Sequence, residues 1–259
     1  MKLPIFQVDA FTSKAFSGNP AAVCPLDCWL EDDLMQKIAE ENNLSETAFF
    51  VNRGDYYQIR WFTPQAEVSL CGHATLASAW VIMNKIQPEL NKIKFGSRGG
   101  ELKVRREDDL YLMDFPVHQP QPCEVPPFLL EGLGSQPEEI LASNYYMAVY
   151  KTEDEVRNLK PYMKLIKELD RIGVIITAPG KTVDFVSRFF APALGIPEDP
   201  VTGSAHCSLI PYWSGKLKKR VMEAKQVSPR GGNIRCEQLA DRVMIGGKAR
   251  LFMTGQIEF

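Results

Sequence analysis

Two short segments of the sequence combine residue types that carry acid–base and anion-binding chemistry. The first is Cys71-Gly72-His73, and the second runs from Asp199 to Ser204. In each segment, a glycine opens an apolar run with the character of a helix. The unpaired amides of a helix's first turn, together with the helix dipole, favour a bound anion. The sequence therefore predicts two anion-binding helix starts.

The two segments belong to a pattern that occurs twice. Residues 60–64 read RWFTP before the first segment, and residues 188–192 read RFFAP before the second. The offset is about half the chain, which predicts a duplicated architecture with one site between the halves. We place the halves at 1–116 and 117–259, divided near the proline-rich stretch 116–127, with the option that the last strand returns to the first half.

Short strands and few helices are expected around these segments. The stretch 30–41 is amphipathic and predicts a helix, whereas 74–83 is apolar nearly all round and predicts a helix enclosed by strands. In the second half, 137–140 predicts the start of a short helix or a turn. A further amphipathic helix is expected over 153–169, interrupted at Pro161.

Two polar residues near the expected strands have two readings each. Glu46 stands at the start of the predicted strand 45–51. It is either an exposed residue at a strand end or, if Phe49 or Phe50 encloses it, a general acid or base. Asn19 lies in a Gly-Asn-Pro turn signal, where it serves either the turn or a ligand.

The remaining ligand-type residues do not form a recognised metal or nucleophile motif. Cys71, His73, Asp199, His206 and Cys207 lack the usual zinc spacing, so we predict no metal. A Cys71–His73 nucleophile pair is not favoured, because residues i and i+2 at a helix start rarely face each other. His206 lies on a buried helix and is more typical of a core histidine than His73.

Composition excludes several classes of protein. A hydrophobic content of 45%, a charged content of 24% and a net charge of −2 indicate a soluble globular chain without a nucleic-acid face or a polybasic membrane anchor. No apolar run reaches the roughly 20 residues of a spanning helix. Six cysteines without a C-x-x-C pattern do not indicate a disulfide framework. We therefore expect a cytoplasmic protein that binds neither nucleic acid nor membrane.

Four motifs in order, GNPAAV, SETAFF, CGHAT and EDPVTGSAH, together resemble the PhzF-like family, the phenazine biosynthesis-type isomerases with the diaminopimelate epimerase fold. The resemblance covers essentially the whole chain. It implies an α/β (α+β) fold of two pseudo-symmetric halves, each a curved sheet wrapped around a central helix. It also implies an active site at the two helix starts and a metal- and cofactor-independent isomerase, usually a homodimer.

The resemblance also suggests roles for individual residues. Glu46 looks like the catalytic acid/base in the cleft between the halves, and His73 and Asp199 resemble partners that orient the substrate and help to move protons. By the same resemblance, the substrate-binding residues are Gly72, Gly203, Ser204 and, near the same site, Asn19.

A comparison with related epimerases separates the possible reactions. Epimerases of this fold use two cysteines, one at each helix start, whereas here Cys71 has the first place, Asp199 the second, and Cys207 lies a turn further into the helix. This favours a proton shift by Glu46 on a small carboxylate. Two alternatives stay open: an amino-acid epimerase or racemase that uses Cys71, and a non-catalytic binding or interaction protein on the same scaffold.

Overall fold

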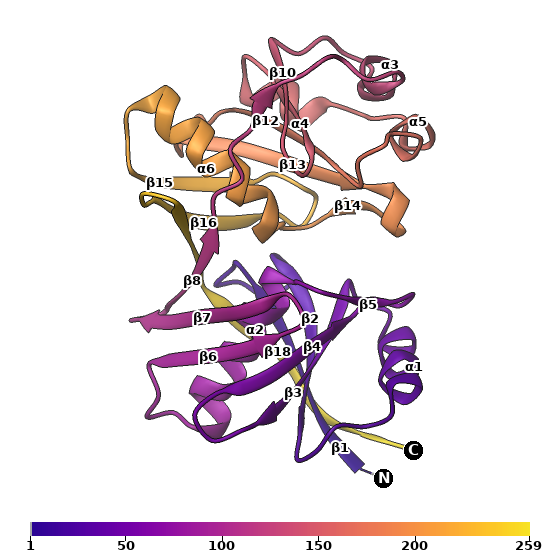
Figure 1. Cartoon of the computed structure of the whole chain (residues 1–259), viewed down its shortest axis with the longest axis vertical. Helices are drawn as coiled ribbons and strands as arrows, with labels where there is room; N and C mark the ends of the chain where they lie inside the picture. Colours follow the sequence, from indigo (N-terminus) through magenta and orange to yellow (C-terminus); the bar gives the residue numbers. More distant parts are fainter. Residues whose placement is uncertain (1) are drawn as a thin grey trace. The chain divides into compact units, whose positions relative to one another are not determined.

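The computed structural model describes residues 2–259 and divides the chain into two compact units (Figure 1). The first unit contains Met1–Asp114 and Gly246–Phe259, and the second contains Phe115–Ile245. The chain thus leaves the first unit once and returns to it for its last strand. Among the helices of residues 2–259, none combines the length and apolar character that a membrane crossing requires.

The first unit is built on one sheet, with strands in the order β18-β1-β2-β3-β4-β6-β7-β8 and a short β5 paired to β4. The pairs β2–β3 and β4–β6 are parallel, and the others are antiparallel. The strands are β1 (Lys2–Ala10), β2 (Asn19–Leu26), β3 (Glu46–Asn52), β4 (Tyr57–Phe62), β5 (Glu67–Val68), β6 (Lys92–Ser97), β7 (Gly100–Glu107), β8 (Leu110–Pro116) and β18 (Ala249–Glu258).

Helix α2 (Gly72–Val81) is the central helix of this unit and continues into a π-helical turn at Ile82–Ile86. It packs against β1, β2 and β3, and its side chains are buried on nearly all sides. Its buried hydroxyls at Thr75 and Ser78 donate to the carbonyl oxygens four residues earlier, at 2.5 and 2.7 Å. The expectation of an enclosed apolar helix is therefore confirmed. Helix α1 (Asp32–Asn42) packs against β3 and β4.

The second unit repeats this topology. Its pairs β10–β11, β11–β12, β12–β13, β13–β14, β13–β15 and β15–β16 have the same order and directions as β1–β2, β2–β3, β3–β4, β4–β5, β4–β6 and β6–β7. Two pseudo-symmetric halves, each a sheet around a central helix, are thus confirmed.

The strands of the second unit are β9 (Gln121–Pro122), β10 (Glu139–Ala142), β11 (Tyr146–Val149), β12 (Val174–Pro179), β13 (Phe185–Ala191), β14 (Ile196–Asp199), β15 (Val221–Gln226), β16 (Gly232–Gln238) and β17 (Arg242–Gly247). The helices are α3 (Leu129–Leu133), α4 (Glu153–Asn158), α5 (Met163–Lys167), the 3-10 turn Pro192–Leu194 and the central α6 (Gly203–Leu217).

The repeated arginine has the same structural role in both units. Arg60 holds Glu67 through two hydrogen bonds of 2.8 and 2.7 Å, and Arg188 holds Glu198 through two of 2.7 and 3.0 Å. Each guanidinium also lies over the phenylalanine ring two residues further on, 5.1 and 4.9 Å from its centroid. Both glutamates lie just before a central helix, so each bidentate pair fixes the loop that delivers a helix start.

Two local predictions in the second unit have different outcomes. The stretch 137–140 does not start a helix or a turn, because Glu139–Ala142 forms β10 and pairs with β11. The Pro-Glu-Glu sequence imitates a helix start, but cross-strand pairing outweighs this local preference. The helix expected over 153–169 is interrupted around Pro161 as predicted, leaving the short α4 and α5.

Candidate active site

Three elements of the first unit meet at one cluster of polar side chains. Asn19 is the first residue of β2, and Glu46 is the first residue of β3. These two strands are parallel and adjacent, with Ala21 opposite Glu46, so their first residues lie at the same edge of the sheet. The start of α2 brings His73 to this edge.

The side chain of His73 is enclosed and contacts a partner through each ring nitrogen. Its Nε2 lies 3.1 Å from Oε2 of Glu46, and its Nδ1 lies 3.2 Å from Nδ2 of Asn19. The side chains of His73 and Glu46 are only 5% and 13% exposed. Glu46 is therefore not an exposed residue at a strand end. Its side chain is enclosed, and a histidine lies beside the carboxylate.

Both charge states of His73 place a proton on Nε2. Burial alone lowers the pKa of His73, but the negative charges of a Cys71 thiolate and of the Glu46 carboxylate outweigh it and raise that pKa well above its usual value. While Cys71 is protonated, Glu46 is the neighbour that supplies the charge. An imidazolium carries protons on both nitrogens, and a neutral ring that accepts from Asn19 at Nδ1 carries its proton on Nε2. A proton on Nε2 therefore lies on the side of the ring next to Glu46, at a 3.1 Å approach that is an ion-pair contact and not an aligned hydrogen bond among residues 2–259.

Cys71 contacts His73, contrary to the expectation from sequence spacing. Its Sγ lies 3.5 Å from Nδ1 of His73. The expectation was wrong because Cys71 is the residue before the helix and has an extended backbone, with φ −145° and ψ 111°, so helical spacing does not apply to it. Burial raises the pKa of Cys71 to about 11, which keeps the thiol protonated at neutral pH.

The same cluster contains three metal-ligand types but does not fit a metal ion well. Ligand atoms of Glu46, Cys71 and His73 lie within 4.8 Å of one another. However, Glu46 approaches Nε2 of the imidazole and Cys71 approaches Nδ1, and one ion cannot lie along the lone pairs of both nitrogens. An ion at either nitrogen would have two protein ligands, fewer than the three or four of zinc sites.

The second unit presents Asp199 at the end of β14, where a hydrogen-bond network fixes it. Thr202 donates its hydroxyl to the Asp199 carboxylate at 2.5 Å. The buried Gln226 donates to the Asp199 carbonyl at 2.7 Å and accepts from the Thr202 amide at 2.8 Å. The loop before α6 is thereby tied to β15, and the Asp199 side chain is held by its own loop.

Ser204 follows at the second position of α6, next to Gly203. Its hydroxyl lies 2.9 Å from the hydroxyl of Tyr145, whose ring packs edge-on against Phe189 at 4.9 Å. Burial raises the pKa of Tyr145, so its hydroxyl stays neutral and can donate to Ser204. Tyr145 thus sets the orientation of a hydroxyl at this helix start.

His206 and Cys207 belong to the core of the second unit. His206 donates from Nδ1 to the Thr202 carbonyl at 2.8 Å, and burial lowers its pKa to about 4. It is a neutral core histidine, as its place on a buried helix suggested. Burial also raises the pKa of Cys207 to about 12. Neither residue supplies a charged group at neutral pH.

The residues proposed from the sequence form two groups, one in each unit. The first group contains Asn19, Glu46, Gly72 and His73 at the start of α2. The second contains Asp199, Gly203 and Ser204 at the start of α6. Sequence reasoning missed Tyr145 and Gln226, which act through contacts 59 and 24 residues away along the chain. No local spacing connects such distant residues, so only the fold reveals them.

Comparisons with known proteins agree with this architecture. Residues 8–255 match the family model described as phenazine biosynthesis-like protein, PhzC-PhzF. An uncharacterized isomerase of Pseudomonas aeruginosa is 52% identical over 257 residues, covering 99% of this chain and 99% of that protein. The crystal structure of a PhzF family phenazine biosynthesis protein from Enterococcus faecalis has a TM-score of 0.97 and 46% identity, covering 100% of both chains.

A more distant structure supports the fold alone. A probable proline racemase from Agrobacterium radiobacter has a TM-score of 0.66 at 9% identity, covering 99% of this chain and 93% of that one. Together with the duplicated topology, this similarity identifies the fold as diaminopimelate epimerase-like. The names of three curated relatives, each an uncharacterized isomerase, support an isomerase-type function.

Proposed function

The chain belongs to the phenazine biosynthesis-like (PhzF) family, and from this premise we propose that it is a cofactor-independent isomerase that shifts a proton on a small carboxylate. Glu46 is the general acid and base in this proposal. The observation that carries it is the enclosed Glu46–His73 pair, 3.1 Å between Oε2 and Nε2, at the start of a buried helix.

The proposed reaction needs one carboxylate and no external reactant. The Glu46 carboxylate takes a proton from a carbon that is acidified by a neighbouring unsaturated or carbonyl group. The electron pair of the broken C–H bond moves along the conjugated system, and the Glu46 carboxyl returns the proton to another carbon on the same face. His73 supports both protonation states of Glu46, because the proton on its Nε2 can move towards the Glu46 carboxylate or away from it.

The proposed binding groups suit an anionic substrate. The amides at Gly72 and His73 open α2, and those at Gly203 and Ser204 open α6, so each helix offers unpaired donors and the positive end of its dipole. We assign substrate binding to Asn19, Gly72, Gly203 and Ser204. We assign a second catalytic role to Asp199, so each unit supplies one group of residues to the proposed reaction.

The alternative of a thiol-dependent epimerase has less support. A two-thiol racemisation requires one cysteine as a thiolate, whereas burial raises the pKa of Cys71 to about 11 and that of Cys207 to about 12. A non-catalytic scaffold is also disfavoured, because a buried ion pair costs desolvation energy that a purely structural core avoids. A catalytic role explains the enclosed Glu46–His73 pair better than a purely structural role.

A hydrogen-exchange experiment tests the proposal. The protein is incubated in deuterated water with a panel of unsaturated cyclic and linear carboxylates, and proton NMR follows loss of C–H signals and appearance of isomers. We expect exchange or isomerisation of at least one acid with the wild type and a loss of about 10²–10⁴-fold in Glu46→Gln. Glu41→Gln, an exposed glutamate on α1, is the matched control. Equal rates in Glu46→Gln and wild type would refute the assignment of Glu46.

The assembly and location of the enzyme are part of the proposal. We propose a homodimer that acts in the cytoplasm, on the basis of the family resemblance and the cysteine usage. Light scattering of the purified protein tests the dimer, and fractionation of the cells that produce it tests the location. A monomer across the working concentration range would contradict the first part.

A further inference from the structure

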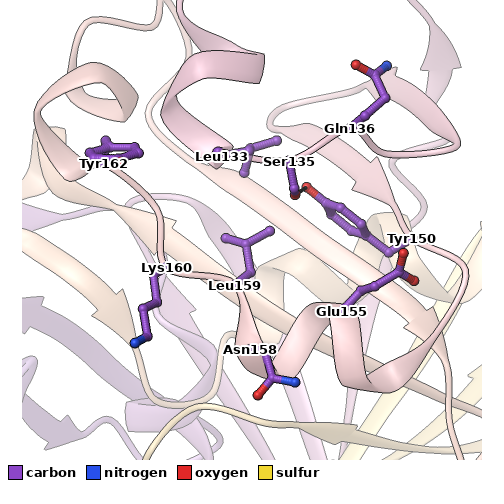
Figure 2. Close-up of a pocket in the computed structure, with 10 residues that line it drawn as sticks. Leu133, Ser135, Gln136, Tyr150, Glu155, Asn158, Leu159, Lys160 and Tyr162 are labelled. Atoms are coloured by element: carbon purple, nitrogen blue, oxygen red, sulfur yellow. Dashed lines mark hydrogen bonds between the residues drawn. The ribbon is translucent and has the colours of Figure 1, made fainter.

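A cavity of about 350 Å³ lies in the second unit, within the range of small-molecule pockets (Figure 2). It lies between the end of α3, the residue after β11 and the last turn of α4. None of the residues assigned above to the proposed reaction lines it.

The floor of this pocket is apolar, and one wall carries hydroxyls. Leu133 and Leu159 are 1% and 7% exposed and form the centre of the view in Figure 2. The Ser135 hydroxyl donates to the Tyr150 hydroxyl at 3.0 Å. The exposed ring of Tyr162 stands on the opposite side of the two leucines (Figure 2). An apolar group with a planar or branched shape fits such a floor.

Two opposite charges flank the floor. Within residues 2–259 the ammonium of Lys160 has no hydrogen-bond or ion-pair partner. Glu155 uses Oε2 to accept from the amide and hydroxyl of Thr152, at 2.7 and 2.8 Å, and its Oε1 has no such partner among the same residues. Figure 2 shows Lys160 and Glu155 on opposite sides of Leu159.

From this arrangement we propose that the pocket binds a free α-amino acid with an apolar side chain. The carboxylate of the ligand pairs with Lys160 and its ammonium with Glu155, while its side chain covers Leu133 and Leu159. Both groups are exposed and hydrated, so an uncharged ligand would form an ion pair with neither, and a simple anion or cation would pair with only one of them. A zwitterion satisfies both ends at once.

Arg188 connects this pocket to Asp199. Its guanidinium donates to the carbonyl oxygens of Val156 and Leu159, at 3.0 and 2.7 Å, and to both carboxylate oxygens of Glu198. Glu198 directly precedes Asp199 in β14. A ligand that packs on Leu159 therefore contacts a segment whose carbonyl oxygens accept hydrogen bonds from Arg188. The same Arg188 side chain holds Glu198, and with it the loop of Asp199. The bound amino acid would thus act as an effector that influences the start of α6.

Titration calorimetry tests the binding step. We expect L-leucine or L-phenylalanine to bind, and the matched acids and amines that lack one of the two charges to bind about tenfold more weakly or worse. Lys160→Met and Glu155→Gln should each weaken binding of the amino acid by a similar factor. Glutamine preserves the helix cap made by Glu155, and Lys151→Met, an exposed lysine outside the pocket, is the control. Absence of binding up to about 10 mM, or unchanged binding in both pocket variants, would overturn the proposal.

Backbone NMR tests the connection without any assay of activity. Saturation with the amino acid should shift the amide signals of Asp199 and Ser204 in the wild type. In Arg188→Lys, which cannot reproduce the bidentate geometry, the ligand should still bind while these shifts shrink. Glu198→Gln is a second variant with the same expectation, in case Arg188→Lys does not fold. Shifts of equal size in a folded variant would refute the role of Arg188.

Discussion

Replacing Glu46 by glutamine should change the titration of His73. The two side chains lie 3.1 Å apart, and at an effective dielectric constant of about 20 two unit charges at this distance interact by about 5 kcal/mol. Desolvation of the buried pair offsets part of this energy. Glutamine has nearly the same shape but no charge, so Glu46→Gln should lower the pKa of His73 towards or below its usual value.

The three histidines of the chain make this effect measurable by NMR of the labelled imidazoles. In the wild type, His206 should titrate lowest, because burial lowers its pKa to about 4. Burial also places the pKa of His118 below the usual value, whereas Cys71 and Glu46 place that of His73 above it. Only the curve of His73 should move in Glu46→Gln, and Glu41→Gln should leave all three curves unchanged.

The same variant has a consequence for stability. A histidine whose pKa is higher in the folded state than in the unfolded state stabilises the fold below the unfolded pKa, and this contribution is lost as pH rises through the folded pKa. The free energy of unfolding of the wild type should therefore fall over that window, and the slope should flatten in Glu46→Gln. A wild-type His73 that titrates below the usual histidine range, or one that Glu46→Gln does not move, would refute the electrostatic account of this pair.

Three further predictions follow from single contacts. Cys71→Ser should keep most of the turnover of any substrate that the exchange panel identifies, since burial keeps the thiol protonated; loss of turnover would favour the thiol route. Glu198→Ala should lower the free energy of unfolding by about 3 kcal/mol in urea titrations, because it leaves the partly buried Arg188 without a carboxylate, whereas Glu67→Ala should lower it less, because Arg60 keeps its ion pair with Asp32 at 2.7 Å; a change near zero in Glu198→Ala would contradict the assigned role of the pair. Gly18→Ala should lower the melting temperature, because its φ is +72° and a Cβ there would lie 2.2 Å from the Ala10 carbonyl oxygen; an unchanged melting temperature would show that the turn relaxes freely.

The duplicated fold could be predicted from the sequence because its repeat is local. An arginine, aromatic residues, a proline and a helix-opening glycine recur in the same order, and the two helices that follow are largely apolar and mostly buried. Such features can be recognised from residues that are neighbours along the sequence. The prediction over 137–140 was wrong because Glu139–Ala142 is a strand through its pairing with β11, which lies outside any local window.

The candidate site could be predicted only as two sets of residues. The motifs identified Glu46 and His73, but not that they face each other, since their contact depends on the parallel pairing of β2 with β3 and on the position of α2. The contact between Cys71 and His73 was misjudged, because a residue before a helix does not follow helical spacing. Tyr145 was missed because an ordinary buried tyrosine and one that orients a serine have the same sequence surroundings.

The two equivalent helix starts carry unequal chemistry, and this asymmetry makes a final prediction. At α2 the cluster holds a titratable histidine next to Glu46, whereas at α6 the carboxylate of Asp199 accepts the Thr202 hydroxyl at 2.5 Å. A single base is therefore expected to do both proton transfers, and Glu46, at 13% exposure, should exchange slowly with water. A substrate with deuterium at the reacting carbon, converted in ordinary water under single-turnover conditions, should give a product that retains part of the label, which mass spectrometry measures. Product free of label from the first turnover, with unreacted substrate still fully labelled, would instead indicate two bases on opposite faces.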